Sequence, residues 1–137
     1  MSEFITQNAL LVVVFFASGT LLIWPSIFKV LGGAKEVGTL EATRMMNTGE
    51  ALVLDIREPG EFNGGHIPKA KNIPLAELDK RVDDISRFKA KPVIVTSGPS
   101  GKASSAARLL KAKGFTNVVE LQGGFGAWQQ ASLPVEK

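Results

Sequence analysis

The pattern of apolar and polar positions divides the chain into two parts. Residues 5–28 contain no charged side chain, and the middle of this run, residues 9–24, is nearly all Leu, Val, Phe, Ile and Ala. A helix needs about 20 apolar residues to cross the hydrocarbon of a bilayer. The pattern therefore predicts a transmembrane helix at residues 5–28, a linker at residues 29–36 and one folded domain at residues 37–134.

Two other interpretations of the N-terminal run fit the sequence less well. A cleaved signal peptide would carry positive charge before the run, but the only early charged side chain is Glu3. A buried core helix would show a polar stripe, which residues 10–16 lack. Trp24 lies where an interfacial aromatic is expected, and Lys29 and Lys35 follow it. Positive charge on that side predicts a membrane protein whose domain faces the cytoplasm, at the inner membrane if the chain is bacterial.

The remaining chain alternates between short apolar runs and amphipathic segments. Strands are predicted at residues 51–56, 92–96 and 117–121, and helices at residues 39–46 with Thr39 as the N-cap, 78–85, around 106–110 and from 123 onward. Residues 67–74 contain two prolines and are expected to be an extended connector. This order predicts an α/β fold with a parallel sheet that helices cover on both faces.

The loop after the second long strand is the best place for a site. Ligands of such sheets bind at the carboxyl ends of the strands. Residues 97–102 follow the strand at 92–96 and lead into a helix N-terminus, where unpaired N–H groups attract anions. A phosphate-binding loop is rejected, because Thr96 and Ala103 stand where that motif needs glycine and Ser or Thr. A catalytic triad of Ser97, His66 and Asp55 can be written, but the sequence gives no geometry for it.

Composition removes several kinds of chemistry. The chain has no cysteine and one histidine, which excludes disulfides, thiolate metal sites and thiol nucleophiles and makes a zinc site unlikely to form. No metal and no cofactor is therefore expected. From Glu36 onward the sequence has 14 Lys or Arg and 12 Asp or Glu. This near balance is not the excess of basic residues that nucleic-acid binding requires.

A specific family resemblance appears at residues 55–74. The segment fits the pattern D-x-R-x-x-x-E-[FY]-x-x-G-H-I-x-G-A-x-N-[IV]-P, with only the glycine expected at Lys69 missing. Later, Gly114-Phe115 and Gly123-Gly124-Phe125-Gly126-Ala127-Trp128 agree as well. Residues 37–134 thus resemble the rhodanese family, which implies an α/β domain that moves sulfane sulfur. The resemblance also implies structural roles for Asp55 and Arg57.

The family nucleophile is the point at which this chain departs from its relatives. Family members read C-x-x-G-x-[RK]-S in the loop and hold a persulfide on the cysteine. Placing Ala106-Ala107 on the family's alanine pair puts Ser97 on the cysteine, Ser100 on the glycine, Lys102 on the basic residue and Ala103 on the serine. A serine hydroxyl is a far weaker acid than a thiol and cannot carry a second sulfur atom.

Two functions stay open from the sequence, so whether the chain is an enzyme is also open. The first is a catalytically inactive module that binds an anion or a partner. The second is a thiosulfate or persulfide sulfurtransferase whose cysteine has been replaced by Ser97. A related phosphatase would also need a cysteine and is disfavoured. The expected partners are the lipid bilayer and a sulfur donor or small anion, with no nucleic acid. The predicted site residues are Ser97, Gly98, Pro99, Ser100, Gly101 and Lys102.

Overall fold

A computed structural model describes residues 2–31, 34–99 and 101–137 of the chain. The chain divides into two compact units, Met1–Gly32 and Gly33–Lys137. Gly32 and Gly33, which belong to the predicted linker, lie outside the described residues.

The N-terminal unit is helical. Helix α1 (Ser2–Gln7) is followed by helix α2 (Ala9–Leu31), and the Asn8 amide between them donates a hydrogen bond to the Phe4 carbonyl at 3.1 Å. Within the described residues, none of the helices has both the length and the apolar character that crossing a membrane requires. The predicted transmembrane helix at residues 5–28 therefore receives no support from the structure. The side chains of Trp24, the predicted interfacial aromatic, and of Lys29, one of the two lysines from which the orientation was predicted, lie outside the described ones.

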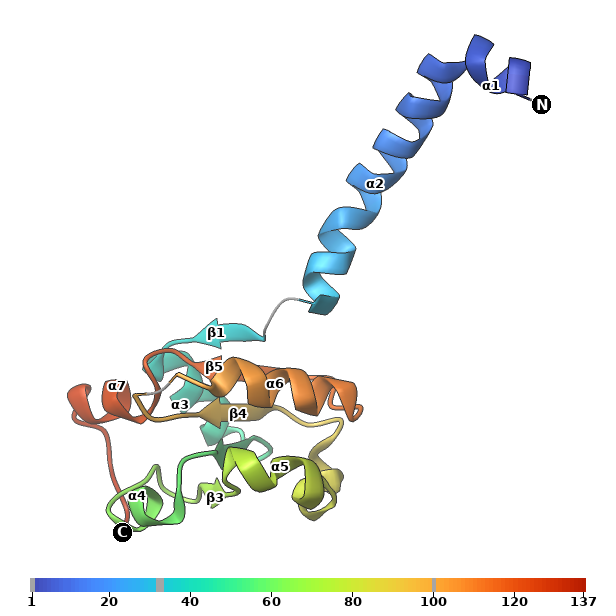
Figure 1. The fold of residues 1–137 in the computed structure, drawn as a ribbon. Coiled ribbons are helices and arrows are strands. Elements are labelled where there is room, and N and C mark those ends of the chain that lie inside the picture. The colour runs from blue at the N-terminus through green and yellow to red at the C-terminus, as the bar shows by residue number, and fades with distance from the viewer. Residues whose placement is uncertain (1, 32–33, 100) are drawn as a thin grey trace. The chain divides into compact units, whose positions relative to one another are not determined.

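The second unit contains a five-stranded sheet whose paired strands are all parallel (Figure 1). Its strands are β1 (Lys35–Val37), β2 (Leu52–Asp55), β3 (Lys71–Asn72), β4 (Val93–Thr96) and β5 (Val118–Leu121), in the spatial order β1-β5-β4-β2-β3. The predicted α/β class with a parallel sheet is confirmed. The three central strands are the three that the apolar runs predicted, because a strand buried on both faces needs a continuous apolar segment.

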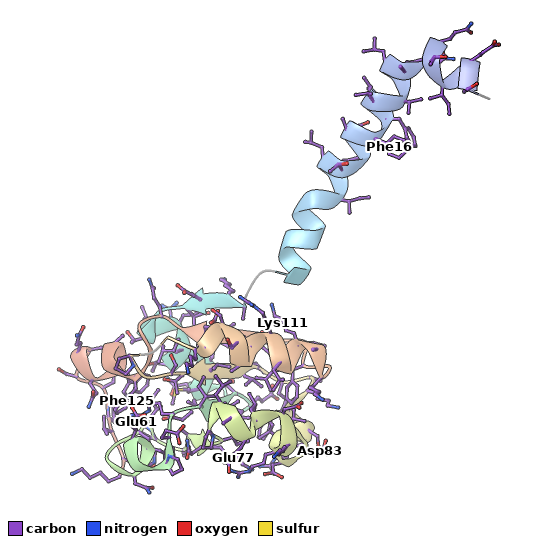
Figure 2. All side chains as sticks on the ribbon, in the orientation of Figure 1. Phe16, Glu61, Glu77, Asp83, Lys111 and Phe125 are labelled. Carbon is purple, nitrogen blue, oxygen red and sulfur yellow. The ribbon has the colours of Figure 1, made fainter. Side chains whose placement is uncertain are left out.

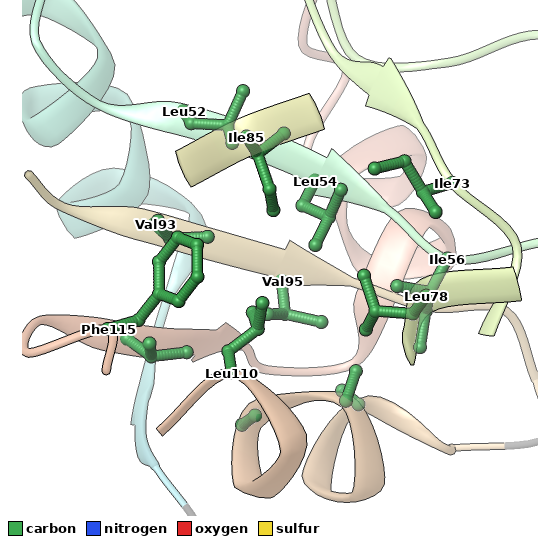
Figure 3. Packing of buried hydrophobic residues seen from close by; sticks show 14 of the residues in the cluster. Leu52, Leu54, Ile56, Ile73, Leu78, Ile85, Val93, Val95, Leu110 and Phe115 are labelled. Atoms are coloured by element: carbon green, nitrogen blue, oxygen red, sulfur yellow. The ribbon is translucent and has the colours of Figure 1, made fainter. Parts of the chain in front are cut away.

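Helices cover both faces of this sheet. They are α3 (Thr39–Asn47), α4 (Pro59–Asn63), α5 (Leu75–Arg81), the 3₁₀ helix η1 (Val82–Phe88), α6 (Ala103–Ala112) and α7 (Gly124–Gln130). One core cluster joins α5, η1 and α6 to the sheet through Leu78, Ile85 and Leu110 (Figure 3). The opposite cluster joins α3 and α7 through Ala42 and Trp128. Alternating strand residues supply both clusters, as the pleat requires.

The structure departs from the sequence prediction at four places. Strand β1 takes Lys35 and Glu36 out of the predicted linker, and β3 lies inside the predicted connector. Gly38, not Thr39, is the N-cap of α3, which begins at Thr39. The helix predicted at residues 78–85 changes to 3₁₀ geometry at Val82, with a non-helical Ile85. Apolar spacing of three and four residues does not distinguish these two helix types, because both place such residues on one face.

Candidate functional site

The loop between β4 and α6 lies at the carboxyl end of the sheet, as the strand order predicted. Ser97 is 6% exposed, directly after the fully buried Thr96. Pro99 and Lys102 are exposed, and Gly98 is half-buried. Ser100, one of the predicted site residues, lies outside the described residues. The loop therefore presents a buried serine at its start and an exposed lysine at its end.

A main cavity of about 530 Å³ opens on one side of this loop. Its lining comes from the loop, from the segment after β2 and from the start of α5: Ile56, Arg57, Glu58, Glu61, Leu75, Ala76, Ser97, Gly98, Pro99 and Lys102. The predicted residues Ser97, Gly98, Pro99 and Lys102 thus share one cavity. Glu58 and Glu61 bring two exposed carboxylates to the same walls, which the sequence analysis did not anticipate.

Arg57 is a buried basic residue that lines the main cavity, and its charge is already matched. Its Nε and one terminal nitrogen donate to both carboxylate oxygens of Asp55, with a shortest distance of 2.8 Å. The Arg57 backbone amide donates to the same carboxylate at 3.0 Å. Asp55 is fully buried and Arg57 is 9% exposed. A fork of parallel hydrogen bonds of this kind fixes geometry as well as charge. The structural roles that the resemblance implied for both residues agree with these contacts.

The Arg57 side chain also ties three segments together. The terminal nitrogen Nη2, which donates to Asp55, also donates to the Gly65 carbonyl at 2.7 Å. The guanidinium carbon lies 4.2 Å from the centre of the Phe125 ring. A further cavity of about 360 Å³ is lined by Arg57, Glu61, Gly65, Phe125 and Gln129, among others. Figure 2 shows Glu61 and Phe125 at the same end of the domain.

Close packing holds the first residue of the loop. The Ser97 carbonyl accepts a hydrogen bond from the Phe125 amide at 3.0 Å. Gly124 has a φ of +60°, and a Cβ atom there would collide with that carbonyl oxygen. The start of α7 can therefore approach the loop only with glycine at this position.

The triad written from the sequence is not assembled. The His66 ring contacts the Phe62 carbonyl through Nδ1 at 2.9 Å and stacks on the Phe62 ring at 3.8 Å. Its Nε2 lies 3.8 Å from a Glu136 carboxylate oxygen. Asp55 is engaged by Arg57, and His66 does not line the main cavity. His66 is a structural residue, because both of its ring nitrogens face groups other than Ser97.

A third cavity, of about 220 Å³, lies against the loop between β4 and α6. Its lining includes residues that the sequence analysis did not predict. It is lined by Glu36, Ser97, Gly98, Pro99, Gly101, Ala103, Ser104, Glu120, Leu121, Gly123 and Gly124. Glu120 is 6% exposed and accepts a hydrogen bond from the Ser104 hydroxyl at 2.9 Å. The sequence did contain an indication of Glu120 as a site residue. It is a charged residue inside an otherwise apolar strand, where a carboxylate needs a partner.

At the start of the loop, Ser97 offers a hydroxyl oxygen. The chain contains no thiol, and Ser97 has no base among its hydrogen-bond partners in the described structure. The side chains of the site can donate and accept hydrogen bonds and pair with charges.

Comparison with known proteins supports this family assignment. The rhodanese-like domain profile matches residues 39–131. YqhL of Bacillus subtilis (strain 168) is 42% identical over 79 residues, 58% of this chain, and the chain spans 61% of its length. YibN of Escherichia coli (strain K12) is 28% identical over 134 residues, 97% of this chain and 94% of YibN. A protein named Sulfurtransferase from Allochromatium vinosum is 30% identical over 92 residues, 67% of this chain and 84% of that protein.

Solved structures give the same result. The Alr3790 protein from Anabaena superposes with a TM-score of 0.66 at 30% identity, covering 73% of this chain and 81% of its own. A thiosulfate sulfurtransferase from Pseudomonas aeruginosa superposes with a TM-score of 0.68 at 25% identity, covering 75% of this chain and 20% of its own. The parallel sheet, the loop after β4 and the profile match over most of the folded unit agree, and the chain belongs to the rhodanese-like domain family.

Proposed function

We propose that this chain is a rhodanese-like domain that binds a partner protein at the loop of residues 97–102 without transferring sulfur. The single observation that carries the proposal is Ser97, a buried serine at the start of the loop in a chain that has no cysteine. Sulfur transfer by a persulfide needs a thiolate to attack the donor and to keep the sulfur until an acceptor arrives. Neither step is open to a serine.

The charges around the main cavity support a protein ligand over a small dianion. Arg57 is neutralised by Asp55, whereas Lys102, the other cation of the lining, forms no ion pair with any residue that the structure describes. Glu58 and Glu61 line the same cavity and oppose the entry of a free dianion. A partner surface can present both signs of charge to such a cavity, which a small anion cannot.

Sulfur transfer tests this proposal directly. The full-length protein is incubated with thiosulfate and cyanide, and thiocyanate is measured. We expect the native protein and Ser97→Ala to remain at the same background, and Ser97→Cys to stay close to it. Turnover by the native protein would overturn the proposal.

The second candidate is a sulfurtransferase disabled by one substitution. It is favoured by the nearly complete family pattern at residues 55–74 and by the relative named Sulfurtransferase. Steady thiocyanate formation by Ser97→Cys would establish this candidate, because the rest of the pocket would then be competent. Unchanged tryptophan fluorescence of that variant serves as the control for folding.

A small oxyanion is a further ligand class for the same loop. Lys102 lines the main cavity and precedes α6, whose first N–H groups carry partial positive charge. Titration of thiosulfate into ¹⁵N-labelled protein would move the amide signals of Gly98, Gly101 and Lys102 if an anion binds there. A matching loss of those shifts in Lys102→Gln would assign the anion to this loop.

Attachment to a membrane through residues 5–28 is part of the same proposal. It rests on the uncharged sequence of that segment and on the exposure of its apolar side chains, such as Leu10, Phe16 and Leu22. The alignment with YibN spans 97% of this chain, so that relative has a counterpart of the segment. We propose the inner face of a bacterial membrane for the domain, because lysines follow the apolar run.

Extraction of cell membranes with alkaline carbonate tests the attachment. We expect the native protein in the pellet and the double variant Val13→Lys/Phe16→Lys in the supernatant, since each lysine at the centre of a span costs about 3 kcal/mol. Glu50→Lys, on the exposed surface of the domain, is the matched control. Recovery of the native protein in the supernatant would contradict the proposal. Because the chain has no cysteine, Lys137→Cys then reports orientation through an impermeant maleimide.

A further inference from the structure

The cavity of about 220 Å³ between the loop and strands β1 and β5 has a feature that the proposed function does not explain. Two of its lining residues, Glu36 and Glu120, are carboxylates, and no lysine, arginine or histidine lines it. It is called the carboxylate cavity below.

Glu120 is the first reason to expect a ligand there. Its side chain is more than nine-tenths buried, and its partner in the described structure is the Ser104 hydroxyl at 2.9 Å. No ion pair of Glu120 is present among the described residues. Buried charges in proteins are paired or ligate a metal, and the single neutral donor from Ser104 leaves the second carboxylate oxygen of Glu120 open to a ligand.

Glu36 adds a second charge of the same sign. Strands β1 and β5 lie side by side (Figure 1), and Glu36 is the register partner of Glu120. Residues paired across neighbouring strands point to the same face, and like charges in this position repel each other. Glu36 is exposed, so it lies at the rim of the cavity while Glu120 lies inside it.

Ser97 provides an independent observation. It lines both the main cavity and the carboxylate cavity, its side chain is 6% exposed, and its hydroxyl has no hydrogen-bond partner within the part of the chain that the structure describes. Ser97 can therefore donate to or accept from a group that enters from outside. Ser104 offers a second hydroxyl in the same cavity.

The size and the ligand set of the cavity distinguish between kinds of cation. A Ca²⁺ ion takes six to eight oxygen ligands at short range, and no group of three or more acidic or histidine side chains that could hold a metal is found in the described residues. The volume of about 220 Å³ exceeds several times the roughly 30 Å³ that one water molecule occupies in the liquid. This space suits an organic cation that carries several N–H donors.

We propose that the carboxylate cavity binds a lysine or arginine side chain of a partner protein, with Glu120 as the buried anchor and Glu36 at the rim. The ammonium or guanidinium group donates hydrogen bonds to the Glu120 carboxylate and to the serine hydroxyls, and its charge relieves the repulsion between the two glutamates. This inference rests on the proposed function, since it names the chemistry of the partner that the loop would bind.

Short peptides provide the test, with full-length ¹⁵N-labelled protein in detergent micelles. The probes are acetyl-Ala-Arg-Ala-amide, its lysine counterpart, and the same peptide with citrulline, which keeps the shape of arginine without the charge. We expect the arginine or lysine peptide to shift the amide signals of Ser104, Gly123 and Gly124, and the citrulline peptide to leave them in place. Glu120→Gln should weaken the affinity at least tenfold, and Glu36→Gln by less, because the rim is exposed to solvent.

Glu50→Gln is the matched control, because Glu50 is exposed and lies outside the cavity. Equal shifts with the citrulline peptide, or an equal loss of affinity in Glu50→Gln, would overturn the proposal. Displacement of the arginine peptide by millimolar MgCl₂ at constant ionic strength would assign the cavity to a metal instead. If Glu120→Gln does not fold, Glu36→Gln alone decides. If no peptide binds and no thiocyanate forms, this inference is rejected, while the proposal that the chain does not transfer sulfur is unaffected.

Discussion

The contact between Gly124 and the Ser97 carbonyl sets the geometry of the loop at the scale of single residues. The Gly124 backbone has a φ of +60°, in the left-handed region, and its missing Cβ leaves room for the carbonyl oxygen. The next amide, of Phe125, donates to that same oxygen at 3.0 Å. One glycine thus positions Ser97, the residue that the family resemblance places at the nucleophile.

Gly124→Ala should therefore destabilise the domain. We expect a loss of about 2–4 kcal/mol, which combines left-handed strain of about 1 kcal/mol with displacement of the Ser97 backbone. Urea unfolding of the full chain measures it. Gly126→Ala is the control, because Gly126 is helical and a Cβ there meets nothing within 4 Å. That control should gain up to about 1 kcal/mol. Equal stability of the two variants would contradict the packing argument.

The Asp55–Arg57 pair is the second residue-scale feature, and its charges are buried. Asp55→Ala leaves the Arg57 guanidinium without its carboxylate in a site with little access to water, so we expect a loss of about 3–5 kcal/mol. Glu77→Ala removes an exposed ion pair with Arg81 at 3.4 Å and should cost less than about 1 kcal/mol. Denaturant midpoints of the two variants compare the two environments, and a small effect of Asp55→Ala would show that water reaches the guanidinium.

At the scale of elements, the C-terminal segment after α7 forms hydrogen bonds with parts of the domain that are distant along the chain. The Trp128 indole N–H donates to the Pro134 carbonyl at 2.7 Å. Glu136 and His66 then exchange two backbone hydrogen bonds of 2.8 and 2.9 Å in an antiparallel bridge. The C-terminal segment thus joins α7 to the segment that follows α4.

Truncation after Leu133 tests how much these hydrogen bonds contribute to stability. Each lost backbone hydrogen bond costs about 1 kcal/mol, and the indole N–H loses its partner. We expect the free energy of unfolding to fall by about 2–3 kcal/mol. Removal of Lys137 alone, which makes none of these bonds, should leave it unchanged. If truncation and control behave alike, the bridge contributes nothing to stability in solution.

At the scale of the whole molecule, the chain divides into two compact units. Both core clusters of the described structure consist of residues from position 34 onward, and no residue of α1 or α2 belongs to them. The folded unit therefore has hydrophobic core clusters of its own.

Phe16→Lys should change the behaviour of the chain at membranes and leave the domain intact. We expect the amide protons of Leu54 and Val95, in the central strands, to exchange with the same protection in the variant and in the native protein, within about 0.5 kcal/mol. Hydrogen exchange in micelles measures both. Lower protection of these amides in the variant would show that α2 contributes to the stability of the domain.

The prediction from sequence succeeded where a local pattern carries the information. The long central strands, the helices of both layers and the position of the loop follow from apolar periodicity and from the order of the elements. Strands β1 and β3, of three and two residues, were missed, because short edge strands are defined by hydrogen bonds to a neighbour and not by their own pattern. The 3₁₀ geometry after Val82 was missed as well, because apolar spacing does not distinguish a 3₁₀ helix from an α-helix.

The amino-acid sequence by itself determined that no thiol is present, since this is a matter of composition, and its resemblance to the family predicted Ser97 at the position of the nucleophile. Only the tertiary structure decided which charges surround that serine. The parallel pairing of β1 with β5 brings Glu36 beside Glu120, and the turn after β2 brings Arg57, already paired with Asp55, to the other side of the loop. Burial and electrostatics depend on neighbours that are distant along the chain, and folding is what brings those neighbours together.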